Sequence, residues 1–133
     1  MFEPYSHAIA ALVLWALLLQ VLGMLSVVGR QAETRCECGK PKRNYADPVY
    51  RRERAFMNAV EGSGPFIAVT VAAILSGAVP FAVNLLASLF IVARLCMAFV
   101  HIKTENQPMR SMFFVVGLGC VFMLAISAFR AVI

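Results

Sequence analysis

The sequence predicts an all-α integral membrane protein: a four-helix transmembrane bundle built as one domain over residues 1–133. Hydrophobic residues make up 61% of the chain and charged residues 14%, which is more apolar side chain than a soluble domain of this length can bury. Long apolar runs recur four times, each long enough to cross about 30 Å of hydrocarbon as a helix. Net charge is +5, and eight of the twelve basic residues lie between Arg30 and Arg54.

The predicted spans cover about residues 7–28, 55–79, 81–103 and 110–132, with a polar loop at 29–47. The first run has no basic region before it, so we read it as a retained span and not as a signal peptide. Because Lys and Arg collect in cytoplasmic loops, both basic loops are predicted to be cytoplasmic and both termini external. A bacterial inner membrane and an endoplasmic reticulum are equally compatible with this topology.

Helix boundaries follow from capping residues. Asp47 followed by Pro48 predicts that the second helix starts in the headgroup zone, with Asp47 as N-cap. Pro65 lies inside that helix and cannot donate to the carbonyl of Glu61, so we expect a kink or local loosening. Pro108 fits the first turn of the fourth helix.

The second helix carries a polar stripe. Arg51, Arg54, Asn58 and Glu61 stand at offsets of three, seven and ten residues, which places them on one face at 3.6 residues per turn. Polar groups in a membrane helix are costly, and they usually pair with one another or face a cavity. For Arg54, Asn58 and Glu61 together a functional site is favoured, because Asn and Glu gain nothing from lipid phosphates. For Arg51 taken singly, an anchor to lipid phosphate is the favoured interpretation.

The topology brings three helices together at one membrane boundary. The third helix supplies Arg94 and His101 there, and the start of the fourth supplies Arg110 and Ser111. So many donors against one intramembrane carboxylate predict a site for an anion, and guanidinium forks bind carboxylates in pairs. Two alternatives stay open: Glu61 is either a ligand-binding group or an ion-pair partner of Arg94 or Arg54, and His101 is either functional or a satisfied interfacial histidine.

The cysteines carry no assigned role. Cys36 and Cys38 lie in the basic loop without a second pair of Cys or His nearby, so no metal site is predicted. A cytoplasmic loop is reducing, and we therefore expect both to be free thiols.

Two motifs resemble those of the MAPEG superfamily, the membrane-associated proteins in eicosanoid and glutathione metabolism that include the microsomal glutathione transferases. The string R-E-R-A-F-M-N-A-V-E-x-x-x-P-F at residues 52–66 is similar to the helix-two signature R-A-x-x-N-x-x-E-x-x-x-P. Arg94, His101 and the run Q-P-M-R-S at 107–111 are similar to the family's R-x6-[Y/H] and P-x-R-S motifs at the junction of helices three and four. Order and spacing agree over essentially the whole chain.

The resemblance implies a homotrimer that binds glutathione, as co-substrate and without a metal, between neighbouring subunits. The implied catalytic residues are Arg110, which would stabilise the thiolate, and Ser111, a nearby hydroxyl donor. The implied or stripe-derived glutathione-binding residues are Arg51, Arg54, Asn58, Glu61, Arg94 and His101. The expected activity is that of a transferase or peroxidase that conjugates or reduces hydrophobic electrophiles or lipid hydroperoxides from the bilayer, and nucleic acid is not an expected partner.

Departures from the catalytic members keep a second function open. Many of those members have Tyr where this chain has His101, and other aromatic or basic residues where it has Met57, Gly62, Met97 and Phe114. Fewer donors favour a non-catalytic lipid-binding or partner-binding protein on the same scaffold. A four-span multidrug exporter is disfavoured, because such exporters place their key carboxylate in the first helix and this helix has none.

Overall fold

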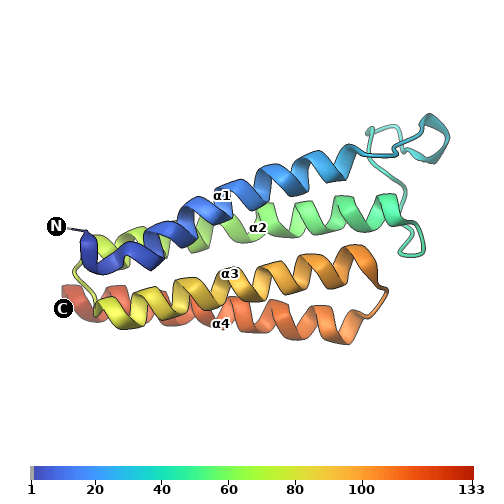
Figure 1. Ribbon diagram of the computed structural model, residues 1–133. Coiled ribbons are helices and arrows are strands. Elements are labelled where there is room, and N and C mark those ends of the chain that lie inside the picture. Colours follow the sequence, from blue (N-terminus) through green and yellow to red (C-terminus); the bar gives the residue numbers. More distant parts are fainter. Residues whose placement is uncertain (1) are drawn as a thin grey trace.

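The chain forms a bundle of four long helices in a computed structural model that describes residues 2–133 (Figure 1). The helices are α1 (Ser6–Val27), α2 (Pro48–Leu75), α3 (Pro80–Lys103) and α4 (Gln107–Val132), with short 3-10 helices η1 (Glu3–Tyr5) and η2 (Ala32–Thr34). All four long helices have the length and composition to cross a membrane. The prediction of an all-helical, multi-pass membrane bundle is therefore confirmed, and residues 2–133 contain no named strand.

The predicted N-cap of α2 is present, and α4 has an N-cap that the sequence analysis did not predict. The Asp47 side chain accepts from the backbone N–H of Val49 at 2.8 Å, and Asn106 caps α4 in the same way by accepting from Met109 at 3.0 Å. The helix α2 continues through Pro65. It starts at Pro48, as predicted, and ends at Leu75, whereas the predicted membrane span of residues 55–79 ran on to residue 79. The earlier end follows from Gly77, whose φ of +71° turns the chain in a region that favours glycine.

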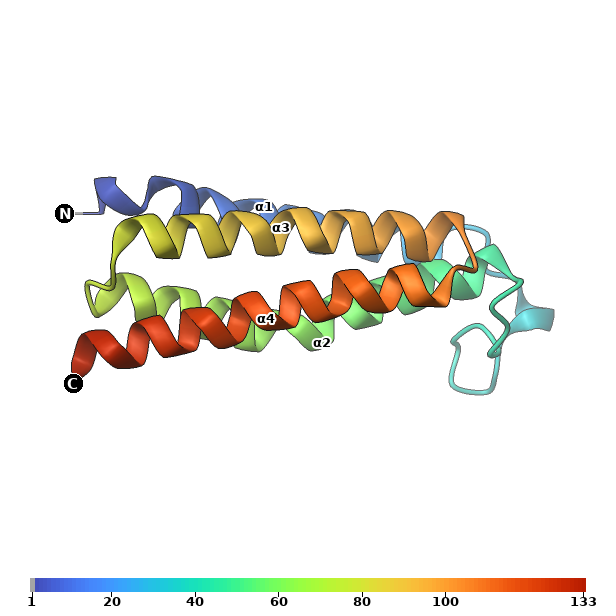
Figure 2. The same ribbon diagram turned by 90° about the horizontal axis from the view of Figure 1, so that it is seen from below.

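The bundle has two different ends (Figures 1 and 2). Both termini and the turn at residues 76–79 lie at one end, which we name the terminal end. The loops at residues 28–47 and 104–106 lie at the other, which we name the loop end. The expectation that the two basic loops share one side is thus confirmed, while their cytoplasmic location stays a prediction.

An aromatic cluster fills the middle of the bundle, between α1, α2 and α3. The rings of Phe66 and Phe90 are stacked with centroids 3.8 Å apart, and Trp15 packs edge-on against both. All three are essentially buried. The Trp15 indole donates to the hydroxyl of Ser63 at 3.1 Å, so its polar atom is paired as well.

Two side chains hold the terminal end together. The Tyr5 hydroxyl donates to the carbonyl of Ala78 at 2.6 Å. Asn84 of α3 accepts from the backbone N–H of Ala8 at 2.9 Å and donates to the carbonyl of Pro4 at 2.7 Å. Asn84 therefore satisfies backbone groups that the start of α1 would otherwise leave without partners.

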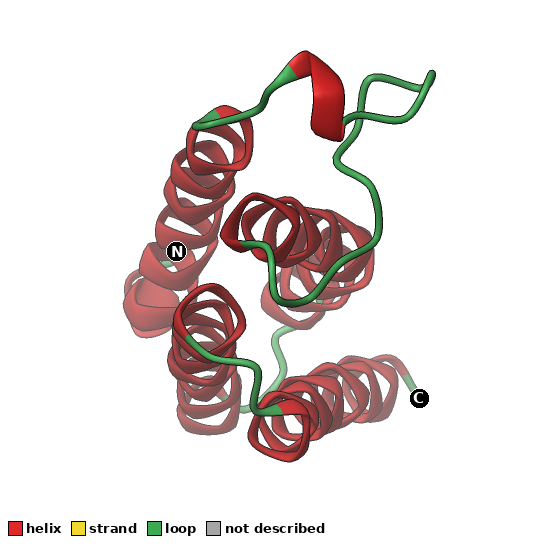
Figure 3. Ribbon diagram, turned by 90° about the vertical axis from the view of Figure 1, so that its right-hand side faces the viewer, coloured by secondary structure: helices red, strands yellow, loops and turns green. Residues whose placement is uncertain are grey.

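The loop at residues 28–47 folds back over the start of α2, as the end-on view shows (Figure 3). The buried carboxylate of Glu53 pairs with Arg30 and lies 3.7 Å from the Lys40 ammonium. The structure joins Cys36 and Cys38 in a disulfide, so the expectation of two free thiols was wrong. The expectation rested on the reducing chemistry of a cytoplasmic loop. In the structure a tight turn, closed by hydrogen bonds from Cys36 N–H to the Lys40 carbonyl and from Gly39 N–H to the Cys36 carbonyl, brings the two cysteine side chains together.

Candidate functional site

A cavity of about 210 Å³ opens at the loop end, between α2, α3, α4 and the end of the long loop. The residues that line it come from all four segments: Tyr45, Arg54, Asn58, Met97, His101, Arg110, Ser111 and Phe114. Five of the eight predicted site residues (Arg54, Asn58, His101, Arg110 and Ser111) thus surround one cavity. They converge because α2 runs away from the loop end while α3 runs toward it and α4 starts there.

His101, Arg110 and Tyr45 form one connected group in this cavity. Arg110 Nη1 lies 3.4 Å from His101 Nε2, and the Arg110 guanidinium lies 5.0 Å from the centroid of the Tyr45 ring. The Tyr45 ring in turn lies nearly parallel to the imidazole of His101, with the two ring centroids 6.3 Å apart. A guanidinium only donates, so Nε2 is the acceptor and the proton of a neutral ring lies on Nδ1. These contacts hold Arg110 over the cavity.

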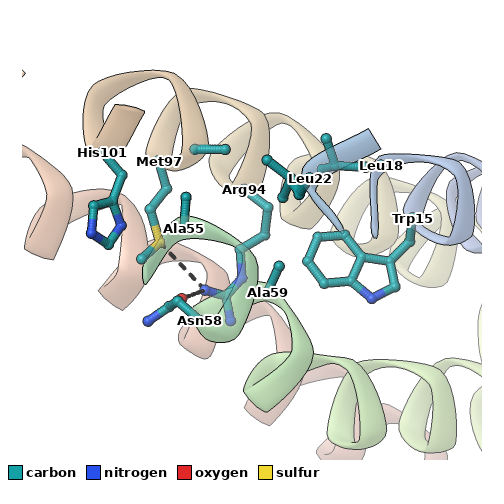
Figure 4. A pocket seen from close by; sticks show the side chains of 10 residues that line it. Trp15, Leu18, Leu22, Ala55, Asn58, Ala59, Arg94, Met97 and His101 are labelled. Carbon is teal, nitrogen blue, oxygen red and sulfur yellow. Dashed lines mark hydrogen bonds between the residues drawn. The ribbon is translucent and has the colours of Figure 1, made fainter. Parts of the chain in front are cut away.

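Arg94 lies deeper, 6% exposed, in the middle of the bundle. Its Nη1 donates to Asn58 Oδ1 at 3.0 Å and lies 3.4 Å from the sulfur of Met97, as Figure 4 shows. The rings of Phe90 and Phe114 lie 5.2 and 5.4 Å from the guanidinium, close enough for cation–π contact. Because Oδ1 faces Arg94, the amide nitrogen of Asn58 is the group left to donate elsewhere.

Glu61 pairs with Arg54 rather than with Arg94. The Arg54–Glu61 separation is 3.8 Å, and the Glu61 side chain is 58% exposed, so this contact contributes little stability. Of the two ion pairs that the sequence left open, the structure has the one with Arg54. Glu61 and Arg94 both line a second cavity of about 170 Å³, which adjoins the first at Asn58 and Phe114.

Arg51 does not reach the cavity, although it belongs to the predicted stripe. Its guanidinium donates to the carbonyls of Tyr45, Ala46 and Ile102 and lies 3.6 Å from the carboxylate of Glu105. It therefore ties the long loop and the end of α3 to α2. Helical spacing puts the Cα of Arg51 on the same face of α2 as the other polar residues of the stripe. Hydrogen bonds to carbonyls of the overlying loop turn the Arg51 guanidinium away from the cavity.

Sequence reasoning missed Tyr45. This residue lies in a loop without periodicity, so no pattern predicts which way its ring points. The available signal was local: Tyr45 lies two residues before the Asp47 cap, and a capped helix start fixes the path of the preceding chain. Tyr45 adds the aromatic wall that supports Arg110.

The charge balance of the cavities favours an anionic ligand. Arg54, Arg94 and Arg110 face the two cavities, and Glu61 is the acidic residue among those that line them. Residues 2–133 contain no group of three His, Cys, Asp or Glu side chains with the geometry of a metal site. Guanidinium forks and an amide donor suit carboxylates and a peptide.

Comparison with known proteins identifies the family. The model of the MAPEG family matches residues 8–130. No curated protein and no solved structure shows significant similarity to the chain. The match spans all four helices, including the second-helix motif and the junction of α3 and α4. The chain therefore belongs to the MAPEG family, the membrane proteins of eicosanoid and glutathione metabolism.

Proposed function

We propose that this protein is a glutathione-dependent membrane transferase or peroxidase that conjugates or reduces hydrophobic electrophiles or lipid hydroperoxides. The observation that carries the proposal is the position of Arg110, next to Ser111 and over a cavity that also contains Arg54 and Asn58. Members of the family bind glutathione and act within membranes. A bilayer location suits an apolar second substrate, which dissolves in the hydrocarbon and reaches the site laterally.

Each residue has a role that its contacts support. Arg54 binds a carboxylate of the tripeptide, and the amide nitrogen of Asn58 donates to the peptide while Arg94 fixes the orientation of that amide. Glu61 receives the ammonium group of glutathione. His101 positions Arg110 through the 3.4 Å contact, and Ser111 offers its hydroxyl to the sulfur. Arg51 acts on the site only through the loop that it holds.

Arg110 promotes the thiolate. A free thiol has a pKa of about 8.5 and is mostly protonated at neutral pH, and a facing guanidinium lowers that pKa. In the transferase reaction the thiolate attacks an electrophilic carbon and forms a thioether, while the bond from that carbon to the leaving group breaks. The leaving group departs with the electron pair and takes up the proton that the thiol released. In the peroxidase reaction one thiolate displaces alkoxide from the hydroperoxide and becomes a sulfenic acid. A second glutathione then forms the disulfide and water, which balances two thiols and one hydroperoxide against a disulfide, an alcohol and water.

A homotrimer completes this proposal. The cavities next to Arg110 and Arg94 are open on the side of α2 and α4, and an adjacent subunit can close them. The mass of the protein in detergent micelles, measured by light scattering with correction for bound detergent, tests the trimer. A monomeric mass with full thiolate formation would refute a shared site.

The deciding experiment follows thiolate formation. Glutathione is added to the purified protein in detergent, and the far-ultraviolet thiolate absorbance is compared with that of Arg110→Ala. We expect a saturable signal in the wild type and its loss in the variant. Arg130→Ala is the matched control, because it removes the same side chain from the other end of α4. No signal at millimolar glutathione in a folded wild type would overturn the proposal.

A non-catalytic function is the second candidate, favoured by two residues that line the first cavity. Met97 and Phe114 present a thioether and a hydrocarbon ring where a hydrogen-bonding site would use donors. Under this alternative the protein binds a lipid or a membrane partner and forms no thiolate. The same absorbance measurement therefore separates the two functions.

A further inference from the structure

The Cys36–Cys38 disulfide lies where a thiol in solution can reach it. Both cysteines belong to the turn at residues 34–42, which we name the cysteine turn and which lies outside the four long helices. Cys38 is exposed and Cys36 is half-buried, whereas the free cysteines Cys96 and Cys120 lie on α3 and α4. The Cys38 sulfur is therefore the atom of the pair that an attacking thiolate reaches most easily.

The location and the spacing of the pair favour a bond that opens and closes. The basic residues of the loop predict that it faces the cytoplasm, where the disulfides that form are usually transient and serve in catalysis or redox sensing. A disulfide stabilises a fold more when it closes a longer loop, and only one residue separates these two cysteines. Stabilisation is thus a weak reason for the bond, and reversible exchange is a stronger one.

The surface around the pair suits an anionic thiol. Arg35, Lys42 and Arg43 are exposed near the disulfide, and they outnumber the exposed carboxylates of Glu33 and Glu37 in the same stretch. Glutathione carries two carboxylates and a single ammonium group. An excess of positive charge therefore raises the local concentration of glutathione at the cysteine turn.

We propose that Cys36 and Cys38 form a reversible thiol–disulfide site that exchanges with glutathione. A glutathione thiolate attacks the Cys38 sulfur, the bond between the two cysteines breaks, and Cys36 leaves with the electron pair. A second glutathione thiolate then attacks the glutathione sulfur of this mixed disulfide, which releases Cys38 and forms glutathione disulfide. The two cysteines take up the two protons that the glutathione thiols gave up. The pair is thereby reduced by two electrons, and two glutathiones are oxidised.

The exchange acts on the loop through the cysteine turn. The Cys36 N–H donates to the Lys40 carbonyl at 2.9 Å, and the Lys40 ammonium lies 3.7 Å from the carboxylate of Glu53 on α2. A short two-stranded turn on its own is marginally stable in water, so the disulfide is a substantial part of what keeps this turn folded. Reduction should therefore loosen the turn and its contact with α2.

This site is separate from the proposed thiolate site. Arg110 and Ser111 line the cavity of about 210 Å³, and neither cysteine of the pair does. Exchange requires only the loop and dissolved glutathione. Arg110→Ala should consequently lose the thiolate signal and retain the exchange, so either proposal can fail without the other.

A titration with glutathione tests the site. The protein in phosphatidylcholine nanodiscs is equilibrated with increasing glutathione at a fixed concentration of glutathione disulfide. Free thiols are alkylated after an acid quench, and peptide mass spectrometry gives the oxidised fraction of the pair. Because each disulfide consumes two glutathiones, the ratio of oxidised to reduced pair should fall about a hundredfold for each tenfold rise in glutathione. A single cysteine in a mixed disulfide would give a fall of only about tenfold.

Substitutions of the two cysteines separate their roles. Cys36→Ser, treated with glutathione disulfide, should gain one glutathione at Cys38, because no second thiol is present to displace it. Cys38→Ser is the matched variant and should gain glutathione more slowly, since Cys36 is half-buried. The wild type should retain none at the pair. Added glutathione should also speed proteolysis within residues 29–47 of the wild type and leave that of Cys36→Ser unchanged.

Four outcomes would overturn the inference. A pair that stays oxidised at every glutathione concentration would be a purely structural disulfide. A pair that stays reduced in glutathione disulfide alone would show that the two thiols do not close the bond. A tenfold slope would assign the exchange to one cysteine. Unchanged proteolysis of the reduced wild type would show that the exchange does not act on the loop.

Discussion

The two ends of the bundle use polar side chains in opposite ways. At the terminal end, Tyr5 and Asn84 bind backbone groups of neighbouring segments, and their hydrogen bonds close that end with neutral partners. Toward the loop end, Arg52 Nε and His101 Nδ1 are buried without a partner in the described chain, as is Arg94 Nε in the middle of the bundle. A fourth such atom, Thr70 Oγ1, lies in the half of α2 nearer the terminal end. Buried polar atoms are usually satisfied. We therefore expect the polar groups of the terminal end to serve cohesion alone, and those of the loop end to combine cohesion with the binding of the proposed ligand.

The largest expected effect comes from removing the buried ion pair of Glu53 at the loop end. Glu53→Ala leaves Arg30 half-buried without its carboxylate and frees Lys40. Losing one partner of a buried pair costs about 3 kcal/mol, so thermal unfolding in detergent should shift downward and residues 29–47 should become sensitive to limited proteolysis. Glu33→Ala, at an exposed position of the same loop, serves as the control. Equal protease sensitivity of both variants would show that the Glu53 ion pair does not hold the loop in place.

A smaller loss is expected at the terminal end. Asn84→Ala leaves the Ala8 N–H and the Pro4 carbonyl without partners, which costs about 2 kcal/mol of unfolding free energy. Glutathione thiolate absorbance should not change, because the variant lies at the opposite end of the bundle. Asn84→Asp keeps the acceptor and loses the donor, so its unfolding temperature should fall between that of the wild type and that of Asn84→Ala. Reduced thiolate formation in a folded Asn84→Ala protein would show that the terminal end also contributes to the glutathione site.

The smallest effect is expected from the Tyr45 ring at the loop end, where two substitutions separate the role of the ring from that of the hydroxyl. Tyr45→Ala removes the ring on which Arg110 and His101 rest, and a cation–π contact contributes about 1 kcal/mol. The glutathione concentration that half-saturates the thiolate signal should rise about fivefold, while Tyr45→Phe keeps the ring and should match the wild type. Identical losses in both variants would assign the effect to the hydroxyl instead.

Helix positions and the convergence of the site could be predicted from the sequence because they depend on local signals. Hydropathy places four spans, and Asp47 and Pro48 mark the start of α2. Short connections then force Arg54, Asn58 and Arg110 to the same end. The ligand roles of these residues stay predictions.

Features that depend on tertiary contacts were out of reach of the sequence. The orientation of Arg51 depends on carbonyls of the overlying loop, and the Cys36–Cys38 disulfide depends on a hairpin without periodicity. The room for the Arg94 guanidinium depends on glycines of two other helices, Gly62 and Gly117, which carry no signal for a partner that far along the chain.

The outward faces of the helices have a thermodynamic consequence. Large apolar side chains such as Leu17, Phe81, Leu75 and Phe122 are more than half exposed on the bundle and contact lipid before and after the helices separate. Unfolding in a bilayer therefore hydrates little new apolar surface, and it is this hydration that gives soluble proteins their large heat-capacity increment. The stability of this bundle should consequently vary almost linearly with temperature, without the curvature that leads soluble domains to cold denaturation.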